Sequence, residues 1–386
     1  MANGKKLTCI DLFCGAGGFS QGFRQQGFSV LAANDIDPCA AQTYRLSHPE
    51  TLFIQGPIET VKPKLLMEAL NFAPGDLDCL IGGPPCQAYS VYNHQRGFHD
   101  ERSGLFREYL RLVEGLQPKS VVIENVTGIL SAGEGRAVEE IHKRLSKLGY
   151  QVNQDTLKAE EFGVPQERRR VFFVGTRSDS APFEFPYPTH GPGRLPFVTV
   201  SDAILDLPHL EILEGDEIAD YGCAPFSPYQ QLLRKKSKTL FNHVAPGLAP
   251  INIERLQHIP QGGSWRDIPI ELLPAGMKKA RRCDHTKRYG RLHPNGLACT
   301  ILTKCDLHWG AFIHPTQQRT LTVREAARFQ SFPDNIRILG SRIEQFKQVG
   351  NAVPPLLAEA IAGALRKHLL SLERSESKCS KLTLAV

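Results

Sequence analysis

The sequence predicts an α/β fold: a doubly wound, mostly parallel sheet with a second, smaller and irregular domain. Strand-like apolar runs alternate with helix-like periodicity between residues 7 and 175, the pattern of parallel strands joined by helices. From residue 181 to 319 the chain is rich in Pro and Gly and has no long helical periodicity. The 386 residues also exceed what one hydrophobic core usually supports. Two domains are therefore expected.

The first domain, residues 1–180, has its predicted elements in the order that a wound sheet needs. Strands are predicted at residues 7–13, 28–33, 79–81, 120–123 and 171–175. Helices are predicted at residues 19–26, 65–71, 105–116 and 136–148. Gly149 follows the last of these helices and suits a helix C-terminus, where a left-handed residue is common.

The end of the chain is predicted to return to the first domain. Thr322 and Glu325 have the spacing of a capping box, which predicts a helix at residues 323–330. A final amphipathic helix is expected after a pair of prolines, which suit the first helical turn. Residues 320–372 would thus complete the first domain, and residues 373–386 are expected to form a disordered tail.

The composition argues against a membrane protein and against a secreted one. The chain is 41% hydrophobic and 22% charged, and it contains no long apolar run. Residues 1–6 lack the apolar segment of a signal peptide. A cytoplasmic location without membrane contact is therefore expected.

The ten cysteines are scattered and include no CxxC pair, so reduced thiols are expected rather than a disulfide framework. Cys299, Cys305 and His308 form the tightest group of metal-ligand types, but their spacing fits no usual zinc pattern. No metal site is predicted.

Positive charge is concentrated in the second domain. Residues 278–291 hold seven Lys or Arg residues and one Asp, and residues 234–238 form a second basic cluster. Basic runs are most often solvated surface, but two of them in one region also fit contact with a polyanion. Nucleic acid is therefore a candidate partner.

Chemically reactive side chains lie at the ends of three predicted strands. Cys86 follows the third strand on a Gly-Gly-Pro-Pro loop, where proline restricts the backbone. Glu124 follows the fourth strand, and Gln166-Glu167-Arg168-Arg169-Arg170 precedes the fifth. The pattern predicts a nucleophile, an acid and a pair of cations in one site.

The first strand leads into a glycine-rich turn that suits a nucleoside-bearing cofactor. Gly15 and Gly17 would let the backbone approach a ligand at the carboxyl edge of the sheet. Ser20 stands where the dinucleotide fingerprint has its third glycine, which disfavours NAD. Asp35, at the end of the second strand, is placed to accept hydrogen bonds from ribose hydroxyls, and a structural turn residue is the alternative.

Together these residues resemble the DNA (cytosine-5) methyltransferases, which use S-adenosyl-L-methionine. The resemblance covers residues 7–175 and 320–370, and the motifs occur in the family's order. They are the glycine turn, the Pro-Pro-Cys-Gln loop at 84–87, Asp100-x-Arg102 with Leu105-Phe106, Glu124-Asn125-Val126, Gln166-x-Arg168-x-Arg170, Arg324-Glu325 and Gln348-Val349-Gly350-Asn351. The resemblance implies a methyltransferase Rossmann-like first domain and a target-recognition role for the second.

The resemblance also implies which residues hold the cofactor. They are Phe13, Gly15, Gly17, Asp35, Ile36, Ile58, Leu105, Asn351 and Val353. One position departs from the pattern, because Pro57 stands where many relatives have an acidic residue that binds the adenine amino group. Proline has no side-chain acceptor, so the backbone, water or a neighbour such as Glu59 must hold the adenine.

Cys86, Glu124, Arg168 and Arg170 are the predicted catalytic residues. Carbon 5 of cytosine is a poor nucleophile, and addition of the Cys86 thiolate at carbon 6 makes the ring electron-rich. Negative charge then develops at N3 and O2, where a protonated Glu124 and Arg170 stabilise it. Arg168 and Arg170 are also the cations expected to lower the pKa of Cys86. A capping carboxylate and surface arginines are the structural alternatives for these side chains.

A cytosine in a duplex must be flipped out before it can react. Residues 87–102 are expected to form a lid that closes over DNA, and Gln87, Ser90 and Asn125 are expected to contact the substrate. Trp265 of the second domain is expected to pack in the interior. Base contacts in that domain are expected from Arg266, Arg291, Thr303 and Lys304.

The resemblance implies a prokaryotic modification enzyme that acts on double-stranded DNA as a monomer, with a cognate restriction endonuclease as a partner. Two other functions stay open. The same chemistry on tRNA is disfavoured, because the Cys-Phe-Thr tripeptide usual in that branch is absent. A catalytically silent DNA-binding regulator is disfavoured, because Cys86, Glu124 and the arginines are all present.

Overall fold

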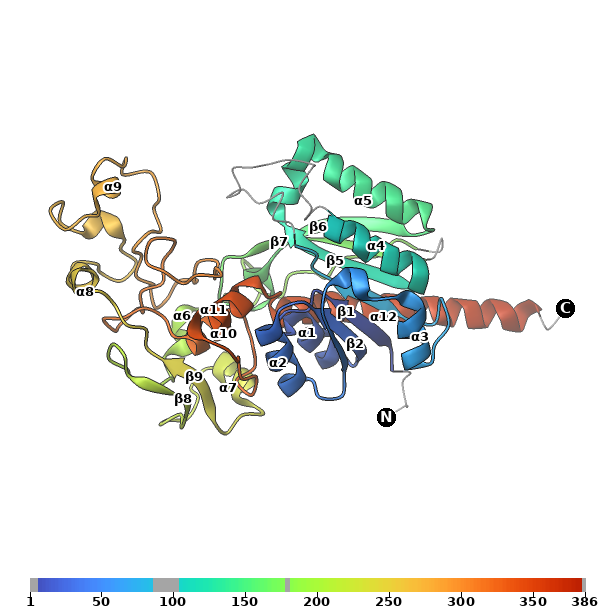
Figure 1. The fold of residues 1–386 in the computed structure, drawn as a ribbon, viewed down its shortest axis with the longest axis horizontal. Coiled ribbons are helices and arrows are strands. Elements are labelled where there is room, and N and C mark those ends of the chain that lie inside the picture. The colour runs from blue at the N-terminus through green and yellow to red at the C-terminus, as the bar shows by residue number, and fades with distance from the viewer. Residues whose placement is uncertain (1–5, 86–103, 178–180, 384–386) are drawn as a thin grey trace. The chain divides into compact units, whose positions relative to one another are not determined.

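The structure, a computed structural model, describes residues 6–85, 104–177 and 181–383, with no side chains described beyond residue 374 (Figure 1). The chain forms two compact units. The first contains the chain up to residue 158, residues 169–188 and the chain from residue 355. The second contains residues 159–168 and 189–354. Among the described residues, none of the helices has the length and apolar character that crossing a membrane would need.

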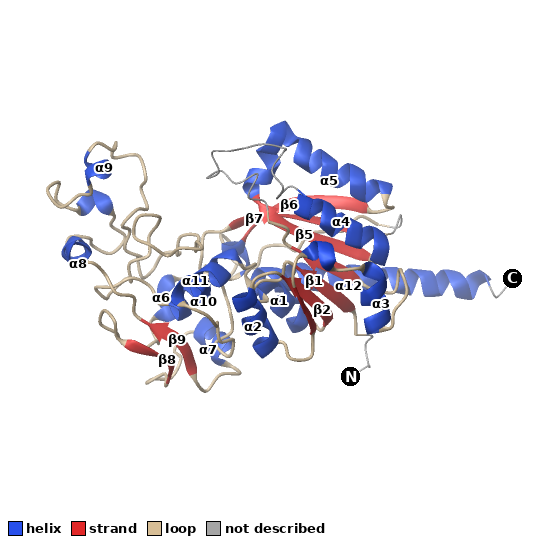
Figure 2. Cartoon of the chain, in the orientation of Figure 1, coloured by secondary structure: helices blue, strands red, loops and turns tan. Residues whose placement is uncertain are grey.

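The sheet of the first unit is doubly wound and mostly parallel, as predicted. Within the described residues it has seven strands, in the order β3-β2-β1-β4-β5-β7-β6. Figure 2 labels β2, β1, β5, β7 and β6 of this sheet. The five strands from β3 to β5 pair in parallel, and β7 is antiparallel to both β5 and β6. The strands are β1 (Thr8–Leu12), β2 (Ser29–Asp35), β3 (Leu52–Gln55), β4 (Cys79–Gly82), β5 (Ser120–Val126), β6 (Gln151–Lys158) and β7 (Arg169–Thr176).

Helices cover both faces of this sheet because the buried strands are apolar on both sides. On one face, Val171 and Phe173 of β7 join a core that includes Tyr109 and Leu145. On the other face, Phe172 meets the ring of Phe19 edge-on, with ring centroids 6.3 Å apart. The helices of the first unit are α1 (Gly18–Gln25), α2 (Pro38–Ser47), α3 (Pro63–Leu70), α4 (Gly104–Leu116), α5 (Arg136–Lys147) and α12 (Pro355–Thr383).

The C-terminal helix α12 packs directly on α1. A Cβ atom at Gly22 would lie 2.5 Å from the Cβ of Ala358, so the two helices meet at a position that has no side chain. Gln25 and Gln26 donate hydrogen bonds to the carboxylate of Glu359 beside this contact. The backbone stays helical to Thr383, which differs from the disordered tail expected from residue 373.

The second unit has little regular structure, as its Pro- and Gly-rich sequence predicts. Its strands β8 (Gly215–Ala219) and β9 (Leu240–Val244) form an antiparallel pair. Trp265 lies in a small apolar core, and its indole N–H donates to the carbonyl of His285 at 3.1 Å, which confirms the predicted packing role. The helices are α6 (Val200–Ile204), α7 (Pro228–Arg234), α8 (Pro250–Gln257), α9 (Ala275–Lys278), α10 (Val323–Phe329) and α11 (Arg342–Asn351).

Buried ion pairs explain why the chain returns to the first unit at Pro355 rather than at residue 320. The predicted capping box forms at the start of α10, where Thr322 accepts from the backbone N–H of Glu325. Glu325 also binds Arg319 through two hydrogen bonds of 2.7 and 2.9 Å, and this pair is fully buried. Arg328 of the same helix pairs with Asp334 at 2.6 Å. Helix α10 therefore belongs to the interior of the second unit, because these charges need their partners there.

Candidate active site

Glu124 and Arg170 form an ion pair at neighbouring strand ends in the first unit. The Nε atom of Arg170 lies 2.8 Å from Oε1 of Glu124. Strand β5 pairs with β7 so that Glu124 lies opposite Phe172, and Arg170 is two residues from that position on the same face. The two side chains are 12% and 14% exposed, so the pair is largely shielded while one side stays open to solvent. The predicted acid and one predicted cation are therefore in direct contact.

The electrostatics of this pair keep both groups in place. Burial lowers the pKa of Arg170, and the Glu124 carboxylate raises it. A second nitrogen of Arg170 donates to the carbonyl of Arg169 at 2.8 Å, which fixes the orientation of the guanidinium. Such a pair presents hydrogen-bond donors and acceptors without the reorganisation that water would need.

The loop that leads to Cys86 passes beside Glu124. A Cβ atom at Gly83 would lie 3.1 Å from Oε2 of Glu124, so a larger residue there would require the carboxylate to shift by a few tenths of an ångström. Asn125 donates to the carbonyl of Pro84 at 3.4 Å and accepts from the backbone N–H of Val126 at 2.8 Å. Asn125 thus holds this loop in place. The sequence predicted only a contact of Asn125 with substrate and did not predict this structural role.

Three of the predicted site residues, Cys86, Gln87 and Ser90, lie outside the described residues. The predicted lid at residues 87–102 lies outside them as well. The described part of the loop ends at Pro85, one residue before Cys86 along the chain.

The glycine turn after β1 contains three residues with left-handed backbone conformations. Phe13, Gly15 and Gly17 all have positive φ angles, of 59°, 51° and 84°. The backbone N–H of Gly15 donates to Oδ2 of Asp35 at 2.8 Å. The other oxygen of Asp35 accepts from the N–H of Asp37 at 2.9 Å, and burial raises the pKa of Asp35. Asp35 therefore braces the turn.

Three of the predicted cofactor residues, Phe13, Ile58 and Leu105, take part in the apolar packing of the first unit. Phe13 and Leu105 pack against the apolar cluster that contains Ile58. Arg111 of α4 donates to the carbonyl of Ile58 at 3.1 Å, which holds the segment after Pro57 against the helix. Ile36, which follows Asp35, is apolar and 66% exposed.

Asn351 and Val353 belong to the second unit. Asn351 is the last residue of α11, and Val353 follows in the segment that leads to α12. Val353 is 7% exposed.

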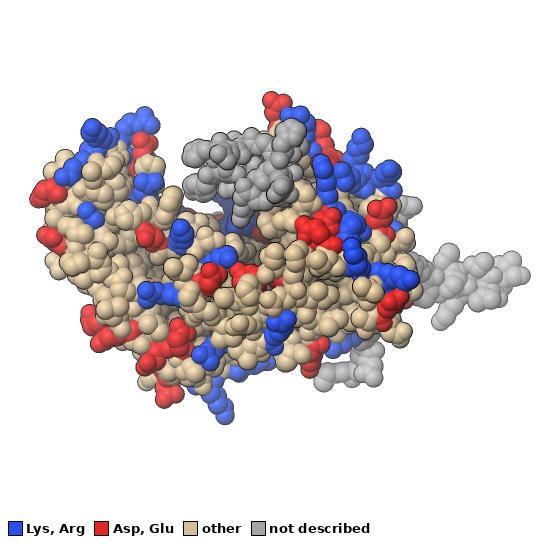
Figure 3. All heavy atoms as spheres, in the orientation of Figure 1, with Lys and Arg blue, Asp and Glu red and all other residues tan. Residues whose placement is uncertain are grey.

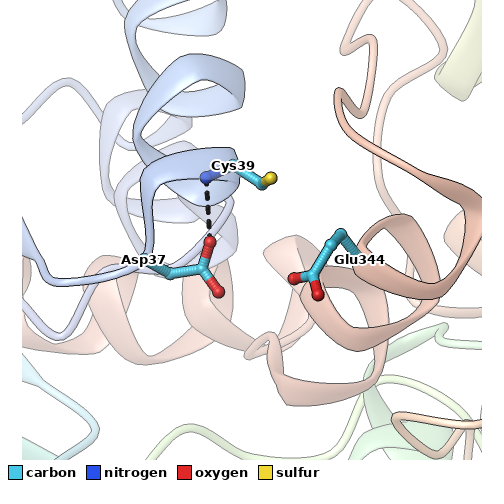
Figure 4. Close-up of side chains that lie close together, drawn as sticks. All are labelled: Asp37, Cys39 and Glu344. Carbon is cyan, nitrogen blue, oxygen red and sulfur yellow. Dashed lines mark hydrogen bonds between the residues drawn. The ribbon is translucent and has the colours of Figure 1, made fainter.

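Two functional features of the first unit were missed by sequence reasoning. Asp37 caps α2 by accepting from the backbone N–H groups of Cys39 and Ala40, as Figure 4 shows for Cys39. The signal for this cap was present, because a carboxylate residue followed by proline is typical of a helix start. Asp11 is buried at the end of β1 and accepts from the backbone N–H and the hydroxyl of Ser20 at 3.1 and 2.6 Å. Burial raises the pKa of Asp11 to about 7.

The arginines predicted to act on substrate or DNA fall into buried and exposed groups. Arg168 is 1% exposed, and its guanidinium contacts backbone carbonyls of its own unit. Arg291 is buried and donates to four backbone carbonyls and to Gln318. Arg234 pairs with Asp206 at 2.9 Å and lies over the ring of Tyr221. These three positions differ from the sequence-based expectation, because guanidiniums occupied in this way stabilise the unit rather than face a ligand.

The exposed candidates are Arg266, Thr303 and Lys304. The basic cluster around α9 is also at the surface, where Lys278, Lys279, Arg281 and Arg282 are exposed. Figure 3 shows Lys and Arg side chains gathered in this part of the second unit. A surface of this kind attracts phosphates without reading bases.

Comparison with known proteins gives a consistent result. Residues 7–367 match the family model for C-5 cytosine-specific DNA methylases. The chain is 37% identical to the Type II methyltransferase M.AgeI of Thalassovita gelatinovora, with 93% of this chain and 99% of that protein covered. It is also 37% identical to the Type II methyltransferase M1.HphI of Haemophilus parahaemolyticus, with 94% and 87% covered.

Solved structures agree in fold. A structure described as a DNA modification methyltransferase encoded within an E. coli prophage has a TM-score of 0.75 at 27% identity, covering 94% of this chain and 99% of that one. The S. pombe Dnmt2 methyltransferase has a TM-score of 0.56 at 18% identity, covering 94% and 99%, and this likeness concerns the fold alone.

Proposed function

The chain belongs to the family of C-5 cytosine-specific DNA methylases, and from that premise we propose that it transfers a methyl group from S-adenosyl-L-methionine to cytosine in a specific duplex sequence. The family supplies the reaction class. The donor, the residue roles and the target are the parts proposed here.

The contact between Glu124 and Arg170 carries the proposed mechanism. Cys86 adds as a thiolate to carbon 6 of a flipped cytosine, and electron density moves to N3 and O2. In this step Glu124 is protonated and gives its proton to N3, and Arg170 donates hydrogen bonds to O2 as charge develops there. The Nε atom of Arg170 and Oε1 of Glu124 are 2.8 Å apart, so the two side chains are close enough to act on N3 and O2, which are both bonded to carbon 2 of the same base. After methyl transfer to carbon 5, a water molecule takes the carbon 5 proton, the released electron pair expels the cysteine as a thiolate, and the N3 proton returns to Glu124.

The residues around the glycine turn suit S-adenosyl-L-methionine, which would supply the electrophilic methyl group. Positive φ angles at Phe13, Gly15 and Gly17 leave backbone free to approach a ligand. Asp35 is held at the end of β2 by two backbone donors, and exposed Ile36 offers an apolar face for the adenine. Asn351 and Val353 are also proposed as cofactor contacts, as the resemblance to the family implies.

Methyl transfer with matched variants tests the proposal. Wild type, Cys86→Ala and Cys283→Ala are incubated with radiolabelled S-adenosyl-L-methionine and either duplex DNA or tRNA. Cys283 is an exposed cysteine of the second unit and serves as the control. Label in duplex DNA from wild type and Cys283→Ala, and none from Cys86→Ala, supports the proposal. Transfer to tRNA alone or to neither nucleic acid contradicts it.

A covalent trap identifies the nucleophile independently. Duplex DNA with 5-fluorocytosine at the target has no proton to lose from carbon 5, so the adduct persists. Peptide mapping of a denaturation-resistant complex should place the bond at Cys86. An adduct at another cysteine would overturn the assignment.

We also propose a cognate restriction endonuclease, because the relatives are named Type II methyltransferases. The resemblance to the family implies in addition that the enzyme works as a monomer. Bisulfite sequencing of DNA from an expressing host would give the modified sequence. Cleavage of unmodified DNA at that sequence by an extract of the source organism would support the presence of the endonuclease. Light scattering of the protein bound to DNA would test whether the enzyme is a monomer.

A further inference from the structure

We propose that Arg168 is a positioning residue that fixes residues 300–304, here called the reading loop, against residues 349–353, the cofactor segment. The inference rests on the proposed function, because Thr303 and Lys304 are the proposed DNA contacts and Asn351 and Val353 the proposed cofactor contacts. Every contact of Arg168 and of these two segments lies within the second unit, and the pair of Arg170 and Glu124 lies within the first.

The guanidinium of Arg168 joins the two segments directly. One terminal nitrogen donates to the carbonyl of Ile301 at 3.3 Å. The other donates to the carbonyls of Gly350 and Ala352 at 3.0 and 2.9 Å. A rigid planar fork can hold three carbonyls from two separate segments at once, whereas a lysine ammonium cannot span them.

Two glutamines extend the same connection. Gln166 accepts from the backbone N–H of Ile301 at 2.8 Å and donates to Gln330 at 3.0 Å. Gln330 in turn donates to the carbonyl of Val349 at 2.7 Å. All of these side chains are buried, so their hydrogen bonds are protected from competition with water.

The backbones of the two segments also touch. A Cβ atom at Gly350 would lie 2.4 Å from the carbonyl carbon and oxygen of Leu302, so a glycine is required for this contact. Movement of the reading loop therefore displaces the cofactor segment, because no side chain separates them.

The position of Arg168 in the sequence connects this arrangement to the catalytic pair. Arg168 precedes Arg170 by two residues, and Arg170 binds Glu124. One short segment thus carries the group proposed to contact the cytosine and the group that holds the reading loop. Correct seating of the loop on DNA is then expected to strengthen cofactor binding, and cofactor binding to strengthen DNA binding by the same factor.

Replacement of Arg168 by lysine tests the inference. The probes are a duplex that contains the modified sequence and S-adenosyl-L-homocysteine, and the Kd of each is measured with and without saturating amounts of the other. Wild type should show coupling of roughly 5- to 150-fold. Arg168→Lys should reduce that factor to near one, while methylation at near-cognate sites rises relative to the true site. Coupling equal to that of wild type in a folded Arg168→Lys protein overturns the inference.

A milder variant and a matched control guard against general loss of structure. Thr300→Val removes a single hydrogen bond of 2.6 Å to the carbonyl of Glu167 and should lower the coupling less than Arg168→Lys does. Arg324→Lys changes an equally buried arginine that donates to Phe241 and Ile336, away from both segments. Coupling should survive this control, and equal loss in Arg324→Lys would overturn the inference.

Methylation by wild type is measured on the same DNA. If wild type transfers no methyl group, the proposed function fails. If wild type methylates DNA but Arg168→Lys keeps its coupling, only the positioning role of Arg168 fails.

Discussion

Gly83 and Glu124 are so close that a methyl group on Gly83 would lie 3.1 Å from a carboxylate oxygen of Glu124. The loop that precedes the proposed nucleophile therefore packs closely against the side chain of Glu124, the proposed acid. This contact also links the sequence of the loop to the position of the acid, because a larger residue would move one or the other.

Gly83→Ala is expected to slow catalysis without unfolding the protein. The added methyl group displaces the carboxylate by a few tenths of an ångström. A misplacement of about 1 Å can cost about 100-fold in rate, so a smaller loss is expected here. Single-turnover methylation and thermal unfolding are measured together. Gly276→Ala is the control, since a Cβ atom there meets nothing within 4 Å. A wild-type rate in Gly83→Ala would show that the position of Glu124 is not critical.

Arg170→Lys and Glu124→Gln are expected to lower kcat while DNA binding persists. Loss of one preorganised donor at a developing negative charge typically costs about 100- to 1,000-fold. The rate is measured by methyl transfer and the binding by fluorescence anisotropy. Arg169→Lys is the matched control, because Arg169 is exposed and its side chain lacks the ion pair to Glu124. Equal losses in all three variants would argue against the assigned roles.

Asp11→Asn is expected to change how stability depends on pH. Burial raises the pKa of Asp11 from 3.8 to about 7, so the folded protein binds a proton that the unfolded chain releases between these values. The stability that Asp11 contributes is complete below pH 3.8 and is lost as pH rises towards 7. The difference in unfolding free energy between Asp11→Asn and wild type should therefore grow in favour of the variant from pH 4 to pH 7. A difference that stays constant over this range, measured by chemical denaturation, would contradict the shift.

Arg281→Ala combined with Arg282→Ala is expected to weaken DNA binding equally for all sequences. Each lost phosphate contact should reduce the slope of log K against log salt by about 0.9. Titrations at several salt concentrations give that slope. Lys64→Ala on α3 removes an exposed charge in the first unit and serves as the control. An unchanged slope in the double variant would remove this cluster from the proposed DNA surface.

The first unit was largely predictable because its buried strands are short apolar runs with reactive residues at their ends. The sequence located β1, β4, β5 and β7 and placed Glu124 near Arg170. Strand β6 was missed because it lies at the edge of the sheet, and its polar, half-exposed residues, Gln151–Lys158, lack the apolar signal. Helix α2 was missed although Asp37 and Pro38 marked its start.

The arginines show what a pattern of residues leaves undecided. Arg168, Arg234 and Arg291 occur in basic sequence, and so do the exposed Arg281 and Arg282. The sequence carries the charge of each but not the backbone carbonyls that surround three of them, because those carbonyls come from distant segments. Only the folded structure therefore shows which of these arginines are buried.

The chain enters the second unit twice, for residues 159–168 and again for residues 189–354. Anyone who grafts target specificity from a relative would naturally exchange the long portion alone. Such a chimera would keep Gln166 and Arg168 of this chain, and these side chains would then face the segment taken from the relative. Exchanging both portions together should give hybrids that fold and choose the donor's sequence.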